Sequence, residues 1–258
     1  MQQKIDTANA LGVTDEQWQA RVDLAAAHRL AVMHGFHEGI FNHLTLTVPG
    51  TADRYYQIPF GLHWSEVNAS CFMEVDYNGK IQRGSGIVEQ SCFAIHAPIH
   101  EKLPHAACVM HTHMPYASAL TRLEDPKIKP IGQTEVGMMA QCAYDMDYPG
   151  PACDPEEGYR LADMFGDKTI LFMGNHGVAT VGKTVAAAYD RLYYIERAAQ
   201  VQLYAMWTGQ PLKMMSPDIV ETTMKNFGGT DLGDKKASDY HFAALKRILD
   251  RQEPDYKE

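Results

Sequence analysis

Closely spaced histidines are the residues of this sequence best suited to chemistry. His111 and His113 follow an apolar run two residues apart, and side chains at that spacing on an extended chain point to the same side. Both imidazoles can therefore reach one metal ion, and a third ligand has to come from elsewhere in the chain. His176 is the best candidate, because it lies in a Gly-flanked turn after a second predicted strand. Three neutral imidazoles with an open coordination position suit a catalytic Zn²⁺, and also Mn²⁺, Fe²⁺ or Co²⁺.

A second pair of histidines, His96 and His100, lies four residues apart on a helix predicted over Ser91–Lys102, with Ser91 as its cap. Residues at this spacing share one face of a helix. His96 is a candidate fourth ligand or acid–base group, because an imidazole titrates near neutral pH. The alternative is that His96 and His100 are core residues with satisfied hydrogen bonds, just as an isolated pair such as His111 and His113 can be structural or exposed.

Hydrophobic periodicity predicts the elements that must position these histidines. Strands are predicted over Leu44–Val48, Tyr55–Ile58, Cys71–Asp76, Ala106–His111, Thr169–Phe172 and Val178–Val181, with an Asn78-Gly79 hairpin turn. Further helices are predicted over Thr14–His34, Met114–Arg122, Thr184–Trp207, Ser216–Asn226 and Ser238–Arg251, the last two separated by Gly228-Gly229. No repeat or linker interrupts them, so we expect one layered α/β domain over 1–258, in which 216–258 is a C-terminal extension.

Composition excludes several classes of function. The chain is 45% hydrophobic and 21% charged, which is typical of a globular protein. A net charge of −9 without a Lys/Arg cluster opposes binding to nucleic acid and to anionic membranes. No apolar run approaches the ~18–20 residues of a membrane helix, and the first residues lack a signal-peptide core, so we expect a cytoplasmic protein. Five widely spaced cysteines predict reduced thiols rather than a disulfide framework.

The histidine motifs and their surroundings resemble the class II aldolase/adducin family over roughly Gln17 to Met215. The resemblance rests on the segments Asn42–Thr45, Pro59–Leu62, Phe93–His96, His111–His113, Ala143–Tyr148 and Asn175–Gly177. It implies a three-layer α/β/α fold around a mostly antiparallel sheet. It also implies that His111, His113 and His176 bind a divalent metal, most simply zinc, and that the protein is a homotetramer that binds a small molecule.

Two departures from the family pattern bear on the substrate. Family aldolases carry an acid–base glutamate four residues before the position of His96, where this chain has Cys92; Glu89 is close by in a different register. Sugar-phosphate members also bind phosphate with a Gly-Asn turn and small hydroxyl residues. Here Phe41 precedes Asn42, and Phe60, which cannot donate a hydrogen bond, precedes Gly61. Asn42, Gly61 and Cys92 are the expected substrate-binding positions, and the expected substrate is not phosphorylated.

The resemblance and the residues together predict a metal-dependent carbon–carbon lyase that acts on a small hydroxy- or keto-acid. Retro-aldol cleavage and decarboxylation both pass through an enolate, which a Lewis-acidic metal stabilises. His96 is the first candidate for the proton carrier, followed by Tyr144, Tyr148 and Glu89. The alternatives are a non-haem iron oxygenase that uses the same histidines, and a non-catalytic binding or scaffold module like the adducin head.

Overall fold

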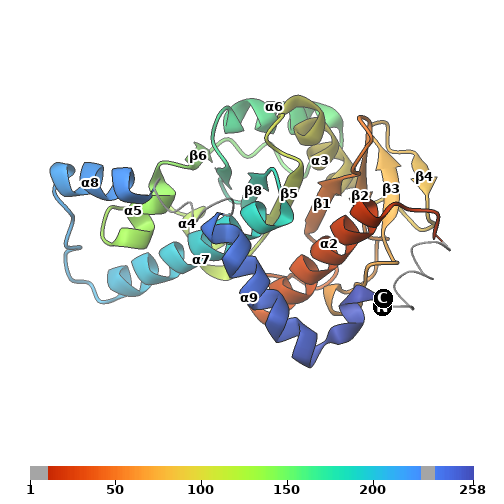
Figure 1. Cartoon of the computed structure of the whole chain (residues 1–258). Helices are drawn as coiled ribbons and strands as arrows, with labels where there is room; N and C mark the ends of the chain where they lie inside the picture. The colour runs from red at the N-terminus through yellow and green to blue at the C-terminus, as the bar shows by residue number, and fades with distance from the viewer. Residues whose placement is uncertain (1–10, 228–235) are drawn as a thin grey trace.

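An eight-stranded sheet forms the centre of the molecule in the computed structural model, which describes residues 11–227 and 236–258 (Figure 1). The strand order is β4-β3-β2-β1-β5-β8-β7-β6, and every neighbouring pair is antiparallel except β6 and β7. The strands are β1 (His43–Thr47), β2 (Arg54–Gln57), β3 (Met73–Asp76), β4 (Ile81–Arg83), β5 (Cys108–Thr112), β6 (Cys142–Asp145), β7 (Ile170–Met173) and β8 (Val178–Gly182).

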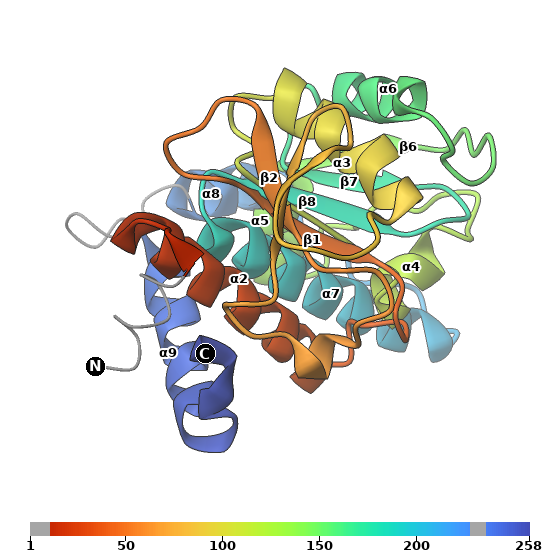
Figure 2. The ribbon, with the colours of Figure 1, turned by 90° about the vertical axis from the view of Figure 1, so that its right-hand side faces the viewer.

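Helices cover both faces of this sheet, as Figure 2 shows. Helices α3 (Gln90–Lys102) and α6 (Pro155–Phe165) pack together on one face, where Ile95, Leu161 and Val109 share a core. Helices α2 (Asp15–Met33), α7 (Val185–Trp207) and α9 (Ala237–Gln252) cover the other face over a larger core. The expected three-layer α/β/α fold with a mostly antiparallel sheet is confirmed.

Capping residues account for where several elements begin. Thr14 accepts a hydrogen bond from Gln17 N–H and Gln17 bonds back, which forms a capping box at the start of α2. Gly79 has φ +80° in the β3–β4 hairpin, a conformation that glycine adopts without strain. The expected cap of α3, Ser91, is wrong: Glu89 caps this helix, since its carboxylate accepts the N–H of Cys92. That cap brings a carboxylate to the sheet beside α3.

The stretch between Arg122 and Thr169 holds three elements that were not predicted from the sequence. These are α5 (Gln133–Met139), β6 and α6, and the short edge strand β4 was missed as well. Helix α5 spans only seven residues without a side-chain cap, and β6 lies at the edge of the sheet beside β7. These short elements are stabilised by tertiary packing more than by local pattern, so periodicity detects them poorly. Helix α6 is different, since Asp154 caps it and Pro155 begins it, which is a helix-start signal that could have found it.

The C-terminal helices lie at opposite ends of α7. Helix α9 packs on α2 and α7, and Arg29 of α2 forms ion pairs with Glu253 and Asp255. Helix α8 (Pro217–Phe227) lies with α5 beyond the sheet in Figure 1. The predicted break at Gly228-Gly229 lies outside the described residues. Among the helices described, none is long and apolar enough to span a bilayer.

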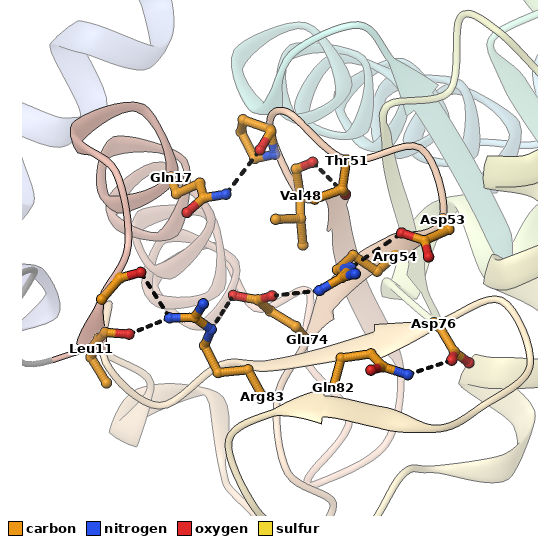
Figure 3. A network of polar contacts seen from close by, with 12 residues as sticks. Leu11, Gln17, Val48, Thr51, Asp53, Arg54, Glu74, Asp76, Gln82 and Arg83 are labelled. Carbon is orange, nitrogen blue, oxygen red and sulfur yellow. Dashed lines mark hydrogen bonds and ion pairs between the residues drawn. The ribbon is translucent and has the colours of Figure 1, made fainter.

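Buried Glu74 fixes the outer strands and the chain that leads into α2 (Figure 3). Its carboxylate pairs with Arg21 at 3.3 Å, Arg54 at 3.6 Å and Arg83 at 3.1 Å. Arg83 also donates to the backbone carbonyls of Leu11 and Gly12. Pairing with three guanidinium groups offsets the cost of burying the charge of Glu74. The cluster is therefore a structural network.

We expect acid to destabilise the protein in part through His28. This imidazole is fully buried, donates Nδ1–H to Leu24 O at 2.8 Å and packs edge-on against Trp64. Burial lowers its pKa to about 4, although the hydrogen bond opposes the shift. The folded-state pKa lies below the unfolded value of about 6.5, so the stabilisation is present above pH ~6.5 and is lost as pH falls towards 4.

Urea unfolding of the metal-free protein at pH 7 and at pH 5 measures this effect. His28→Phe should lose less free energy of unfolding than the wild type between these pH values, by about 2 kcal/mol. The other buried histidines are common to both proteins, so they cancel in the comparison. Equal losses in the two proteins would rule out the assigned role of His28.

Candidate metal centre

Neighbouring strands bring His111, His113 and His176 together. Strand β5 ends at Thr112, and its antiparallel neighbour β8 begins at Val178, directly after the β7–β8 turn that carries His176. One ring nitrogen from each histidine lies within 4.8 Å of the other two. The ring centroids are 4.8–5.0 Å apart and the rings are steeply inclined to one another. The structure therefore brings together the three histidines that the sequence analysis grouped as candidate metal ligands.

Tight backbone geometry sets the position of the third histidine. In the β7–β8 turn, Asn175 has φ +54°, and Met173 N–H bonds to Gly177 O at 2.9 Å. Arg122 donates to His176 O at 2.7 Å and so holds the turn from outside. A Cβ atom at Gly177 would lie 2.6 Å from His113 Cδ2 and 2.7 Å from Thr112 O, so only glycine fits beside these histidines.

Gly177→Ala should therefore disturb the metal site directly. We expect a loss of about 1–3 kcal/mol in stability from overpacking, together with metal affinity weakened by at least tenfold in a chelator competition titration. Gly209→Ala is the matched control, since nothing lies within 4 Å of its Cβ position. Its φ of +69° should cost about 1–2 kcal/mol without altering metal affinity. Unchanged metal affinity in Gly177→Ala would contradict this geometry.

Hydrogen bonds leave lone pairs of these imidazoles available for a metal. His111 donates Nδ1–H to Val178 O at 3.2 Å, and His113 Nδ1 bonds to the Glu38 carboxylate, so Nε2 of each ring carries the lone pair. His113 Nε2 is buried without a partner among the described residues. Burial, reinforced by the neighbouring histidines, lowers the pKa of His111 well below its usual range and that of His176 to about 4. Neutral imidazoles in this arrangement fit a divalent metal ion.

A carboxylate–imidazole pair, Glu89 and His43, adjoins the three histidines. His43 pairs with His111 across β1 and β5, and their ring centroids are 5.9 Å apart. Its Nε2 lies 2.8 Å from Glu89 Oε2, which also accepts Cys92 N–H and the Ser91 hydroxyl. Burial would raise the pKa of Glu89, but these hydrogen bonds hold it at about 2. Glu89 is ionised, and all three of these contacts are made by its Oε2.

His96 and His100 lie behind His43, in the layer between α3 and the sheet. His100 donates Nδ1–H to Ala106 O at 2.7 Å, so its Nε2 accepts the Thr45 hydroxyl at 2.8 Å. Thr45 Oγ1 then accepts Nδ1–H of His96 at 2.7 Å. The His96 ring is 5.5 Å from that of His43 and wholly buried, and burial lowers its pKa well below the usual range. His100 is therefore a core residue whose two ring nitrogens are both hydrogen-bonded. The ring of His96 instead packs against that of His43.

The two expected tyrosines lie in different places. Tyr148 is near the metal centre, with its ring centroid 5.6 Å from that of His176, and it is 44% exposed. It borders an open cavity whose empty volume is about 270 Å³ and whose wall includes Asp145 and Arg160. Tyr144 stacks on Phe172 and accepts a hydrogen bond from Ile128 N–H at 3.1 Å. These contacts tie Tyr144 to a connecting segment rather than to the histidines.

Two of the three expected substrate-binding residues line a second cavity, whose wall also includes His43 and Glu89. Its empty volume is about 290 Å³, and Asn42 and Cys92 both line it. Asn42, at φ +72°, also accepts His113 N–H at 2.9 Å and so orients the backbone of His113. The Cys92 thiol is fully buried, and burial raises its pKa well above the usual range. Gly61, with φ +96°, permits the turn that places its neighbour Phe60 at this cavity.

Several residues of the site were not predicted from the sequence. Glu38 orients His113, His43 joins Glu89 to the metal centre, and Arg122 holds the turn of His176. Glu196 accepts the N–H groups of Tyr116 and Ala117 and so fixes the helix α4 (Pro115–Leu120) that follows His113. Only His43 carried a usable signal, because it lies two residues before Thr45, a spacing that puts both side chains on one face of an extended chain.

Comparison with known proteins agrees with this geometry. A sequence profile of the family described as "Class II Aldolase and Adducin N-terminal domain" matches residues 22–203. The crystal structure of an aldolase II superfamily protein from Pseudomonas syringae superposes with a TM-score of 0.87 at 30% identity, over 95% of this chain and 98% of that one.

Two eukaryotic relatives are similar in sequence. An adducin-related protein of Schizosaccharomyces pombe is 32% identical over 95% of this chain and 78% of its own length. Alpha-adducin of Rattus norvegicus is 32% identical over 89% of this chain, which spans 33% of the adducin. Together with the family profile and the fold, these similarities show that the chain belongs to the class II aldolase/adducin family.

Proposed function

We propose that the protein is a divalent-metal-dependent carbon–carbon lyase that cleaves a small, non-phosphorylated hydroxy- or keto-acid by retro-aldol reaction or decarboxylation. One observation carries the proposal: three neutral imidazoles converge beside a cavity that an ionised carboxylate lines. His111, His113 and His176 would hold the metal, for which zinc is the first choice and Mn, Fe or Co the alternatives. The metal would supply Lewis acidity that polarises substrate oxygens and stabilises developing negative charge.

Glu89 is the proposed proton carrier. Its Oε2 is held by three donors, and Oε1 is left for a substrate hydroxyl in the cavity that Glu89 lines. Retro-aldol cleavage begins when such a hydroxyl gives up its proton, so an ionised carboxylate at this place can act as the base. His43 fixes the orientation of Glu89, and the His96–Thr45 hydrogen bond supports the His43 ring from behind. Tyr148, whose ring lies beside that of His176, remains a candidate donor.

Product analysis of the metal-loaded protein tests this proposal. The protein is incubated with a panel of hydroxy- and keto-acids, and release of CO₂, pyruvate or an aldehyde is followed beside oxygen uptake. We expect metal-dependent cleavage without oxygen consumption. Oxygen uptake that depends on Fe²⁺ would favour the oxygenase instead. Absence of any turnover across the panel would favour a binding role, for which the similarity to adducins is the supporting observation.

We also propose that the protein assembles as a homotetramer. The end of α7 exposes apolar side chains beyond the sheet, with Trp207 at 70% and Tyr204 at 47% exposure. Exposed aromatic residues that lie together are typical of association surfaces. Light scattering coupled to gel filtration should give four times the chain mass of 28.9 kDa. A monomeric mass at micromolar concentration is the result that excludes the assembly.

A further inference from the structure

The cavity beside the metal centre has a predominantly apolar wall away from Glu89. Apolar side chains form this part of the wall: Ile40, Leu44, Ile58, Pro59 and Phe60. Phe60 is 38% exposed at the cavity, and its ring centroid lies 6.2 Å from that of Phe41. His43 and Asn42, which line the same cavity, contact His111 and His113 respectively. A molecule held at the histidines therefore has an adjoining apolar space for the rest of its body.

Gln57 places a buried amide in that apolar wall. It is the last residue of β2, is only 2% exposed and lines the cavity. Its Oε1 lies 3.4 Å from the Tyr55 hydroxyl, whereas its Nε2 has no hydrogen-bond partner among the described residues. An unpaired buried amide costs roughly 1–3 kcal/mol, so such groups are usually paired in the working state of a protein. A ligand in this cavity is in a position to pair it.

The charge of the lining limits what that ligand can carry. Among the described residues that line the cavity, none is Lys or Arg, and Glu89 is ionised. A phosphate or carboxylate in the apolar half would be desolvated without a cationic partner, which is strongly unfavourable. The Nε2 of Gln57 instead suits a neutral acceptor, such as a carbonyl or ether oxygen.

We propose that this cavity binds an uncharged, apolar arm of the substrate, and that Gln57 recognises a hydrogen-bond acceptor on that arm. The inference rests on the proposed function, because the other end of the substrate is taken to be held at the three histidines. It makes Gln57 a specificity residue rather than a member of the proton-transfer machinery. The substrate class is thereby narrowed to hydroxy- or keto-acids with a neutral, mainly apolar substituent.

Hydroxamates test this inference, because they chelate metal ions through two oxygens and can carry different arms. Titration calorimetry would compare acetohydroxamate, benzohydroxamate, 4-acetylbenzohydroxamate and phosphonoacetohydroxamate on the zinc-loaded full-length protein. We expect the phenyl arm to tighten binding about tenfold by apolar burial. The acetyl acceptor should add about fivefold through the amide of Gln57, and the phosphono arm should bind less tightly than the phenyl arm.

Variants of Gln57 test whether this side chain causes the gain in affinity from the acetyl group. Gln57→Leu should abolish the gain in affinity from the acetyl group and keep the gain from the phenyl ring. Gln57→Met, which has a similar length and no donor, should do the same if the leucine variant folds poorly. Gln82→Leu is the matched control, since Gln82 lies on β4 and bonds to Asp76. The inference is overturned if 4-acetylbenzohydroxamate still binds more tightly than benzohydroxamate to both Gln57 variants, or if the phosphono compound binds most tightly. Either result leaves the proposed metal chemistry standing. Failure of every hydroxamate to bind the zinc-loaded wild type overturns the proposed metal chemistry as well.

Discussion

Replacement of His111 or His176 by alanine should leave the protein unable to retain a divalent metal ion through gel filtration. The wild type loaded with zinc should retain about one equivalent per chain, measured by inductively coupled plasma mass spectrometry. Each of these imidazoles offers one of the three converging nitrogens. Loss of a supporting hydrogen bond to a metal ligand already costs about 10–100-fold in affinity, so loss of the ligand itself should cost more.

Two further variants separate the loss of a metal ligand from the loss of a supporting contact and from an unrelated histidine change. Glu38→Gln removes the carboxylate that orients His113 but keeps all three histidines, so its metal affinity should fall by about 10–100-fold. His105→Ala is the matched control, because His105 bonds to Lys168 O away from the three histidines. Equal metal content in the wild type, His111→Ala and His176→Ala would remove the basis for the proposed site.

Glu89→Gln should lower the turnover number by about 10²–10⁴-fold, the range attributed to general acid–base catalysis. The metal content should stay unchanged, since Glu89 is not among the three ligands. The amide cannot take up a proton as the carboxylate Oε1 can. KM should change less than kcat, because the loss falls on a step of proton transfer rather than on substrate binding.

A structural effect must be separated from this catalytic one, since Glu89 also caps α3. Loss of such a cap costs about 0.5–2 kcal/mol, which lowers the melting temperature but leaves the folded enzyme active. Glu101→Gln provides the control on the same helix, where Glu101 accepts a hydrogen bond from the Tyr159 hydroxyl. If Glu89→Gln retains wild-type kcat, another group moves the proton, and Tyr148 becomes the first candidate.

The three converging histidines were predictable because local rules place them. Side chains two residues apart on an extended chain point to the same side, and both histidine segments follow predicted strands. The local pattern does not show that β5 and β8 are neighbours, and it is their pairing that brings His176 to His111. The grouping of His176 with His111 was supported by the resemblance to the family, and so was the expectation of a mostly antiparallel sheet.

The supporting residues were not predictable for a physical reason. Glu38 and His113 are 75 residues apart in sequence, and Gln57 becomes a buried amide only through the packing of β2. Glu89 acquires its contact with His43 because α3 lies over β1. Long-range contacts of this kind depend on tertiary packing, which neither periodicity nor spacing encodes. Short elements such as α5 were missed for the same reason.

X-ray absorption at the zinc edge of the loaded protein tests the three-histidine centre most directly. We predict a shell of nitrogen and oxygen ligands at about 2.0–2.1 Å, with outer-shell scattering from three imidazoles. In His176→Ala loaded with equimolar zinc, the imidazole scattering should fall to that of two rings. A first shell of sulfur at about 2.3 Å, or the same spectrum from wild type and His176→Ala, would contradict the assignment of the metal to these histidines.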